Sequence, residues 1–195
     1  MPEMTKYQMI DNYIYLYHTD TLIIVPEYSA DSINDTMSVN FQSTTPLSRS
    51  APVFSYAGSG PRSLQVSFKL HRDMMQQINV KNTKTTVDIG DDYVDRMIKE
   101  VQAAALPAYA VSQKMVNPPI VALRLGDDIF IKGVVSGGVS VSYDYPILSN
   151  GKYASVSIGF TIQEIDPYDA ETVIKYGSFR GLSTSLERRV WKAAH

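Results

Sequence analysis

Apolar and polar residues alternate with a period of two along much of this chain. Residues 63–70 show the pattern clearly, because Leu64, Val66 and Phe68 alternate with polar residues. Successive side chains of a strand point to opposite faces, so this period predicts half-buried strands. The predicted strands are 13–17, 21–25, 38–42, 63–70, 120–125, 129–135, 139–145 and 153–165. We therefore predict a mainly β fold of the α+β class.

Turn signals between these strands favour antiparallel pairing. Asn150-Gly151 separates two of the predicted strands, and this dipeptide is the strongest short hairpin signal because it tolerates positive φ. Ser136-Gly137-Gly138 interrupts another alternating stretch and predicts a bulge or a tight hairpin.

One amphipathic helix is predicted over about 91–106. Apolar residues recur there at helical spacing, Asp91 or Asp92 is placed to cap the first turn, and Pro107 ends the helix. A single helix of this kind is expected to flank the sheet and cover one of its faces.

Two changes in the sequence pattern predict how the chain is divided. The polar, proline-containing stretch over about 43–62 reads as a long loop. After Asp166-Pro167 the alternation stops. We predict one β domain over 1–169, followed by a C-terminal arm over 170–195.

Composition excludes several classes of function. The 195 residues carry 18 basic and 20 acidic side chains, so a net charge of −2 offers no basic excess for a dedicated nucleic-acid binder. The absence of cysteine removes disulfides and thiol chemistry. Neither a secretory signal nor a stretch of about 18 apolar residues is visible, so we expect a soluble product made in the cytoplasm without membrane contact.

No residue pattern indicates catalysis. His18, His71 and His195 lack metal-binding spacing, and the acids at 88–92 lack the spacing of a calcium loop and suit a helix start instead. We therefore predict that the chain is not an enzyme and that it uses no cofactor or metal.

Three tyrosines, Tyr13, Tyr15 and Tyr17, fall on one face of the first predicted strand. No basic residues accompany them as a nucleic-acid stacking platform would require, which favours a packing or subunit-contact face. Further contact candidates lie in the hairpin strands 129–145 and 153–165 and in the C-terminal arm. They are Phe130, Lys132, Tyr143, Tyr145, Tyr153, Arg188, Arg189 and Trp191.

Several segments, in this order and spacing, resemble the tail-tube and baseplate proteins of contractile-tailed bacteriophages. The downstream segments are Pro118–Gly126, Gly133–Val135, Val139–Val141, Pro146–Leu148, Gly151–Ala154 and Phe160–Tyr168. The upstream ones are Gly60–Ser63, Phe68 and Leu70–Met74. Together they cover roughly residues 50–170.

The resemblance implies a fold and a role. The fold is an antiparallel sandwich or open barrel with two sheets and a flanking helix. The role is that of a structural virion protein whose copies, six being the expected number, form a ring around the DNA channel. The implied partners are these copies and neighbouring tail-tube and baseplate hub or wedge proteins, with passive DNA contact in the lumen. Assembly would take place in the host cytoplasm, and no catalytic residue is implied.

The long loop and the C-terminal arm favour a tube initiator or hub-adjacent subunit over the repeating tube protein. The competing interpretation is a small β-rich binding module, without catalysis, that recognises cell-wall glycan or a protein partner. A hydrolase is disfavoured because no acid–base pair is visible.

Overall fold

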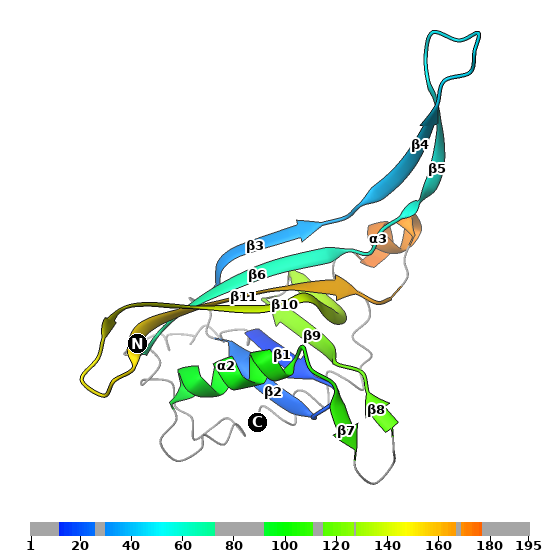
Figure 1. Ribbon diagram of the computed structural model, residues 1–195. Helices are drawn as coiled ribbons and strands as arrows, with labels where there is room; N and C mark the ends of the chain where they lie inside the picture. Colours follow the sequence, from blue (N-terminus) through cyan, green and yellow to red (C-terminus); the bar gives the residue numbers. More distant parts are fainter. Residues whose placement is uncertain are drawn as a thin grey trace, which may run out of the picture.

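The main element of the protein is one open, seven-stranded antiparallel sheet (Figure 1). The computed structural model describes residues 12–25, 30–72, 92–110, 115–126, 128–166 and 169–176. The strands follow the order β2-β1-β9-β10-β11-β6-β3. Their bounds are β1 Asn12–Leu16, β2 Thr21–Val25, β3 Ala30–Thr36, β6 Ser63–His71, β9 Ile120–Leu125, β10 Ile129–Ile147 and β11 Tyr153–Glu164.

The predicted class, mainly antiparallel β with one flanking helix, is confirmed. The described strands differ from the expected pair of sheets, because the seven long strands share one continuous sheet. The remaining strands form two separate two-stranded hairpins. These are β4 Val39–Thr44 with β5 Val53–Ser59, and β7 Ala108–Ala110 with β8 Met115–Asn117.

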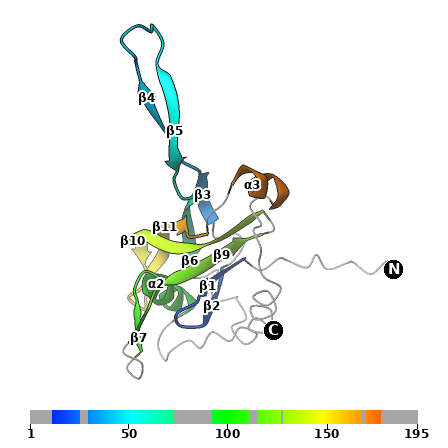
Figure 2. The ribbon, with the colours of Figure 1, turned by 90° about the vertical axis from the view of Figure 1, so that its right-hand side faces the viewer.

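The core lies between one face of this sheet and helix α2, Tyr93–Ala103. Leu64, Val66 and Phe68 are fully buried there, as their alternation predicts. The helix contributes Val94 and Met97 to the same cluster. Figure 2 shows α2 on one side of the sheet and the β4–β5 hairpin rising from the other.

The start and end of helix α2 are explained by residues close to each end. Asp92 is the N-cap, and its side chain accepts a hydrogen bond from the backbone N–H of Asp95, whose carboxylate in turn accepts from the backbone of Asp92. This reciprocal capping satisfies two backbone donors of the first turn. The helix ends ahead of Pro107, so the predicted helix over 91–106 is confirmed with slightly shorter bounds.

The two predicted strands 129–135 and 139–145 are one bent strand, β10. The pairing with β11 shifts between Ser136 and Val139, so Gly137 and Gly138 form the predicted bulge. Both glycines have positive φ, which L side chains rarely adopt. The turn at Asn150-Gly151 joins β10 to β11, also as predicted.

The stretch predicted as a loop over 43–62 contains a strand. Thr44 ends β4, and β5 covers Val53–Ser59, so the connection between them is residues 45–52. Residues 60–62 are also irregular. We call β4, β5 and this connection the projecting hairpin. Serine, threonine and glycine obscure its alternation, although Phe54 and Tyr56 share one face.

Little of the predicted C-terminal arm lies within the described residues. Its first part forms the short helix α3, Ala170–Tyr176. The division of the chain at residue 170 stays a prediction. In the described part of the chain, neither α2 nor α3 has the length and apolar character needed to cross a membrane.

Candidate assembly surfaces

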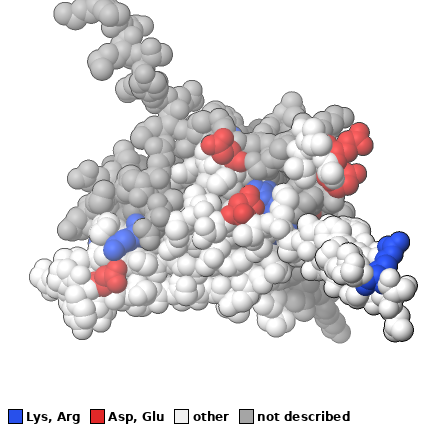
Figure 3. Space-filling model, turned by 90° about the horizontal axis from the view of Figure 1, so that it is seen from above, with Lys and Arg blue, Asp and Glu red and all other residues white. Residues whose placement is uncertain are grey.

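The face of the sheet turned away from α2 is polar and nearly neutral over four adjacent strands, β3, β6, β11 and β10. Cross-strand pairs such as Gln65 with Thr161 and Ser142 with Ser157 lie on this face. The residues beside them along β6 and β11, such as Val66, Ile158 and Ile162, are buried in the core. Lys69 and Asp144 form an exposed ion pair here at 3.7 Å. Figure 3 views the molecule from above and shows charged side chains scattered rather than gathered into a basic patch.

An open groove crosses this face at the β10 bulge. Small residues line it, among them Ser67, Ser136, Gly137, Ser140, Gly159 and Thr161. It offers hydroxyl and backbone groups but no acid–base pair. Among the described residues, no three potential ligands of the His, Cys, Asp or Glu type gather to hold a metal.

The root of the projecting hairpin is fixed by a buried arginine. Arg62 is 1% exposed, and its Nε and Nη2 donate to the carboxylate of Asp35 at 2.9 and 2.6 Å. Its Nη1 donates to the carbonyl of Phe130 at 3.2 Å. Bidentate pairing of this kind fixes direction as well as position. Arg62 therefore ties β3, β6 and β10 together where the hairpin leaves the sheet.

The projecting hairpin exposes every side chain of β4, yet its two faces differ. Phe41 pairs with Tyr56, and their rings meet edge to face at 5.6 Å. Phe54 lies on the same face, two residues from Tyr56. The three rings are 59%, 61% and 65% exposed and form what we call the aromatic face. The opposite face carries Gln42 and Ser55.

A second exposed aromatic group lies where β10 turns into β11. The ring of Tyr153 is 5.4 Å from that of Tyr143 and 5.7 Å from that of Tyr145. Tyr145 is 78% exposed and Tyr143 is 49% exposed. We call these three side chains the tyrosine tip.

A charged network holds the backbone beneath the tyrosine tip. Arg72, 4% exposed at the end of β6, donates to the carbonyl of Tyr153 at 2.7 Å and to Asp95 at 2.9 Å, and it also pairs with Asp92. Lys152, in the turn, pairs with Asp95 as well. Burial alone would raise the pKa of Asp95, but the hydrogen bonds from Arg72 and Lys152 outweigh it and lower the pKa to about 2.

This lowered pKa predicts acid sensitivity. A carboxyl with a depressed pKa stabilises the fold above the unfolded value of about 4, and that contribution disappears as the pH falls towards 2. We expect Asp95→Asn to lower the unfolding free energy by about 1–2 kcal/mol at pH 7. The difference from the parent protein should shrink between pH 4 and pH 2. Urea titrations at these pH values measure it.

Asp144→Asn is the control for the Asp95 variant, because its ion pair lies on the surface, where such pairs contribute about 0–1 kcal/mol. A difference between Asp95→Asn and the parent that stayed constant from pH 7 to pH 2 would contradict the role given to this carboxylate.

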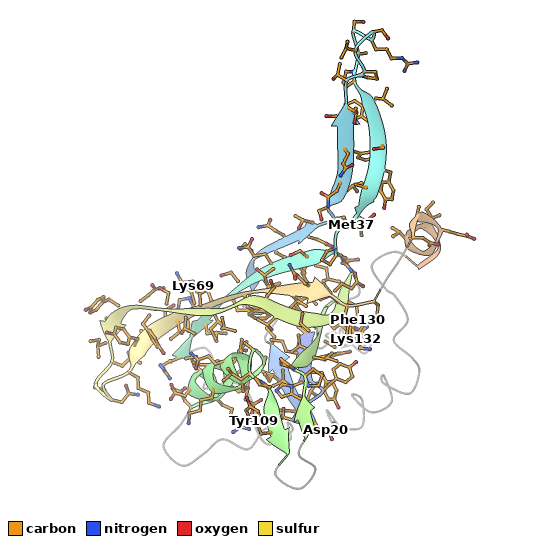
Figure 4. The ribbon with its side chains drawn as sticks, turned by 45° about the vertical axis from the view of Figure 1, so that its right-hand side comes forward. Asp20, Met37, Lys69, Tyr109, Phe130 and Lys132 are labelled. Atoms are coloured by element: carbon orange, nitrogen blue, oxygen red, sulfur yellow. The ribbon has the colours of Figure 1, made fainter. Side chains whose placement is uncertain are left out.

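The structure separates the predicted contact residues into three groups. Tyr13, Tyr15 and Phe130 are buried in a second apolar cluster on the chain itself, so the contacts of these rings are internal. The ammonium of Lys132 lies 5.6 Å from the ring centre of Tyr17, and both side chains are half-buried. Figure 4 labels Phe130 and Lys132 beside each other.

The tyrosines Tyr143 and Tyr145 are exposed, and Tyr153 joins them at the tip. The predicted candidates Arg188, Arg189 and Trp191 lie outside the described residues. Sequence reasoning missed the aromatic face of the projecting hairpin. Its signal is the spacing of Phe54 and Tyr56, two residues apart.

No protein-family model matches this chain, and no curated protein matches it. Sixteen chains of solved structures are similar to this chain, and two of them are described here. The first is a chain of the tail of an empty gene transfer agent particle, determined with C6 symmetry. It has 12% identity and a TM-score of 0.40 over 82% of this chain and 96% of that chain. The second is a chain of the virion of a native gene transfer agent particle. It has 12% identity and a TM-score of 0.38 over 80% of this chain and 96% of that chain. Similarities at this level assign neither a family nor a function.

Proposed function

We propose that this chain is a structural subunit of a phage-type tail, whose copies form a closed ring around a DNA channel. The observation that carries the proposal is the polar, nearly neutral face of β3, β6, β11 and β10. Its other side is packed on the core, so this four-strand segment has one buried and one hydrated face. Such a surface suits the wall of an aqueous channel.

The near neutrality of this face would keep its binding to DNA weak. A wall rich in lysine and arginine would hold DNA through many phosphate contacts, whereas passage requires weak binding. Ser142 and Ser157 present hydroxyl groups, and the charges of Lys69 and Asp144 offset each other. DNA contact in the channel is therefore passive, and no catalytic step is needed.

Ring closure requires contact between unlike surfaces of neighbouring copies. Strands β2 and β3 are the two edges of the open sheet. An edge strand carries unpaired backbone groups that pair readily with another chain. Six copies joined through such edges would give a virion ring. Its neighbours would be further copies, the tail tube and the baseplate hub or wedge.

The projecting hairpin favours a specialised position in the tail. Residues 37–61 add an exposed ribbon to the sheet, and a free two-stranded ribbon is only marginally stable in water. A contact that covers this ribbon accounts for its apolar side chains. The proposed subunit is therefore a tube initiator or a hub-adjacent baseplate protein.

Size exclusion with light scattering, over a range of concentrations, combined with negative-stain imaging of the same fractions, tests the ring. We expect six-membered rings, or stacks of them, with a central hole. A monomer at every concentration that is retained on cell-wall glycan would overturn the proposal and support the binding-module interpretation.

A further inference from the structure

The turn that joins β10 to β11 contains an asparagine followed by a glycine, Asn150-Gly151, and both residues are exposed. This turn lies at the end of the sheet remote from the projecting hairpin. His71 pairs with Ser155 at this end, whereas Ser63, beside the hairpin root, pairs with Gln163. The turn is therefore open to water and connects the two strands that carry the tyrosine tip.

Asparagine is a chemically labile residue, and a following glycine makes it more so. In deamidation, the backbone nitrogen of the next residue attacks the side-chain carbonyl carbon of the asparagine and closes a succinimide ring. Glycine has no Cβ to shield its nitrogen, so the attack meets less steric hindrance than at a residue with a side chain. Nothing lies within 4 Å of a Cβ built at Gly151, which leaves room for the ring.

The hydrogen bonds of this turn act on both reacting groups. The side-chain Oδ1 of Asn150 accepts from the backbone N–H of Lys152 at 3.0 Å. This bond folds the side chain back along the turn, and it draws electron density from the carbonyl carbon that is attacked. The N–H of Gly151 donates to the carbonyl of Leu148 at 2.9 Å. The second bond has to open before the nitrogen reacts, so the folded turn sets the rate.

We propose that Asn150 is a site of spontaneous deamidation, which converts it to a mixture of aspartate and isoaspartate. A bond forms between the nitrogen of Gly151 and Cγ of Asn150. The side-chain nitrogen leaves as ammonia and takes up the proton of the Gly151 N–H. Water then opens the succinimide at either carbonyl and leaves a carboxylate and a proton. No group is oxidised or reduced, and water is the only co-reactant.

The product adds a negative charge beside a network that depends on a cation. The ammonium of Lys152 pairs with Asp95 and lies 3.8 Å from the carboxylate of Asp92. A carboxylate at position 150 competes for this ammonium, and isoaspartate also lengthens the backbone of the turn by one methylene group. We therefore expect deamidation to loosen the backbone beneath the tyrosine tip.

Peptide mapping by mass spectrometry tests the site. The full chain is incubated at mildly alkaline pH in water enriched in a heavy oxygen isotope, which marks deamidation in the protein and separates it from deamidation during digestion. We expect Asn150 to be converted at least several-fold faster than Asn40, an exposed asparagine of β4 that is followed by phenylalanine. Asn150→Gln should remove the modification of this turn and leave the conversion of Asn40 unchanged.

Equal rates at Asn150 and Asn40, or no conversion at Asn150, would overturn the proposal. Conversion that occurs only after unfolding in urea would also overturn it, because the folded turn would then protect the asparagine. The consequence is tested separately with Asn150→Asp, whose urea midpoint should lie below that of Asn150→Gln. Equal midpoints would contradict the loosening of the turn. The reaction needs only this turn, so it is independent of ring formation.

Discussion

Replacing Asp35 with alanine is expected to lower the unfolding free energy by about 3 kcal/mol, because it leaves a buried guanidinium without its counter-ion. Arg62 is 1% exposed, and Asp35 provides its bidentate partner. Breaking a buried ion pair typically lowers the unfolding free energy by about 3–5 kcal/mol. Because the carboxylate of Asp35 is 38% exposed, we expect a loss at the lower end of this range. Urea denaturation at pH 7 measures this loss.

Asp144→Ala is the matched control for this experiment. Its ion pair with Lys69 has both side chains more than 40% exposed, so its removal should cost about 0–1 kcal/mol. Equal losses in the two variants would contradict the anchoring role of Arg62. If Asp35→Ala proves too unstable to purify, Asp35→Asn keeps a hydrogen-bond acceptor and should lose less.

Replacing Gly133 with alanine is expected to lower the unfolding free energy by about 3 kcal/mol. The reason is that strands β10 and β11 approach each other too closely at this position to leave room for a side chain. A Cβ at this position would lie 1.9 Å from the carbonyl oxygen of Gln163 and 2.9 Å from a methyl carbon of Ile162. The carbonyl belongs to the backbone of β11 and cannot rotate away. Relief requires β10 and β11 to separate, which is an extreme form of overpacking.

Gly137→Ala, in the same strand, separates this clash from the general effect of adding a methyl group. Gly137 has a φ of 75°, and nothing lies within 4 Å of a Cβ built there. We expect this variant to lose about 1 kcal/mol of unfolding free energy, which comes from backbone strain alone. Thermal and urea unfolding of both variants measures the difference. A larger loss at Gly137 than at Gly133 would contradict the packing described for β10 and β11.

Local sequence was sufficient for the elements that local physics governs. The alternation of Leu64, Val66 and Phe68 identified β6 and its buried face. The capping acid Asp92 and the later Pro107 bounded α2, because both act within a turn of their own position. The Asn150-Gly151 turn placed the β10–β11 hairpin for the same reason.

The contact surfaces were less accessible to sequence reasoning. Tyr13 and Tyr15 alternate as strand residues should, and period two separates the two faces of their strand. It does not say which faces the rest of the chain covers. In the structure both faces of β1 are buried, so these rings belong to a core and not to an outer surface.

The sequence by itself therefore determined most strands of the main sheet, helix α2 and the mainly antiparallel class, since hydrophobic period, capping and turn chemistry depend on residues close in the chain. It did not predict β3 at the edge of the main sheet or β5 in the hairpin. Only the tertiary structure decided that β4 and β5 extend beyond the sheet as a ribbon, because they pair with each other and no strand of the main sheet flanks them. It also placed the aromatic face and the tyrosine tip at opposite ends of the molecule. That separation is set by pairing between strands distant in sequence, which no local pattern encodes.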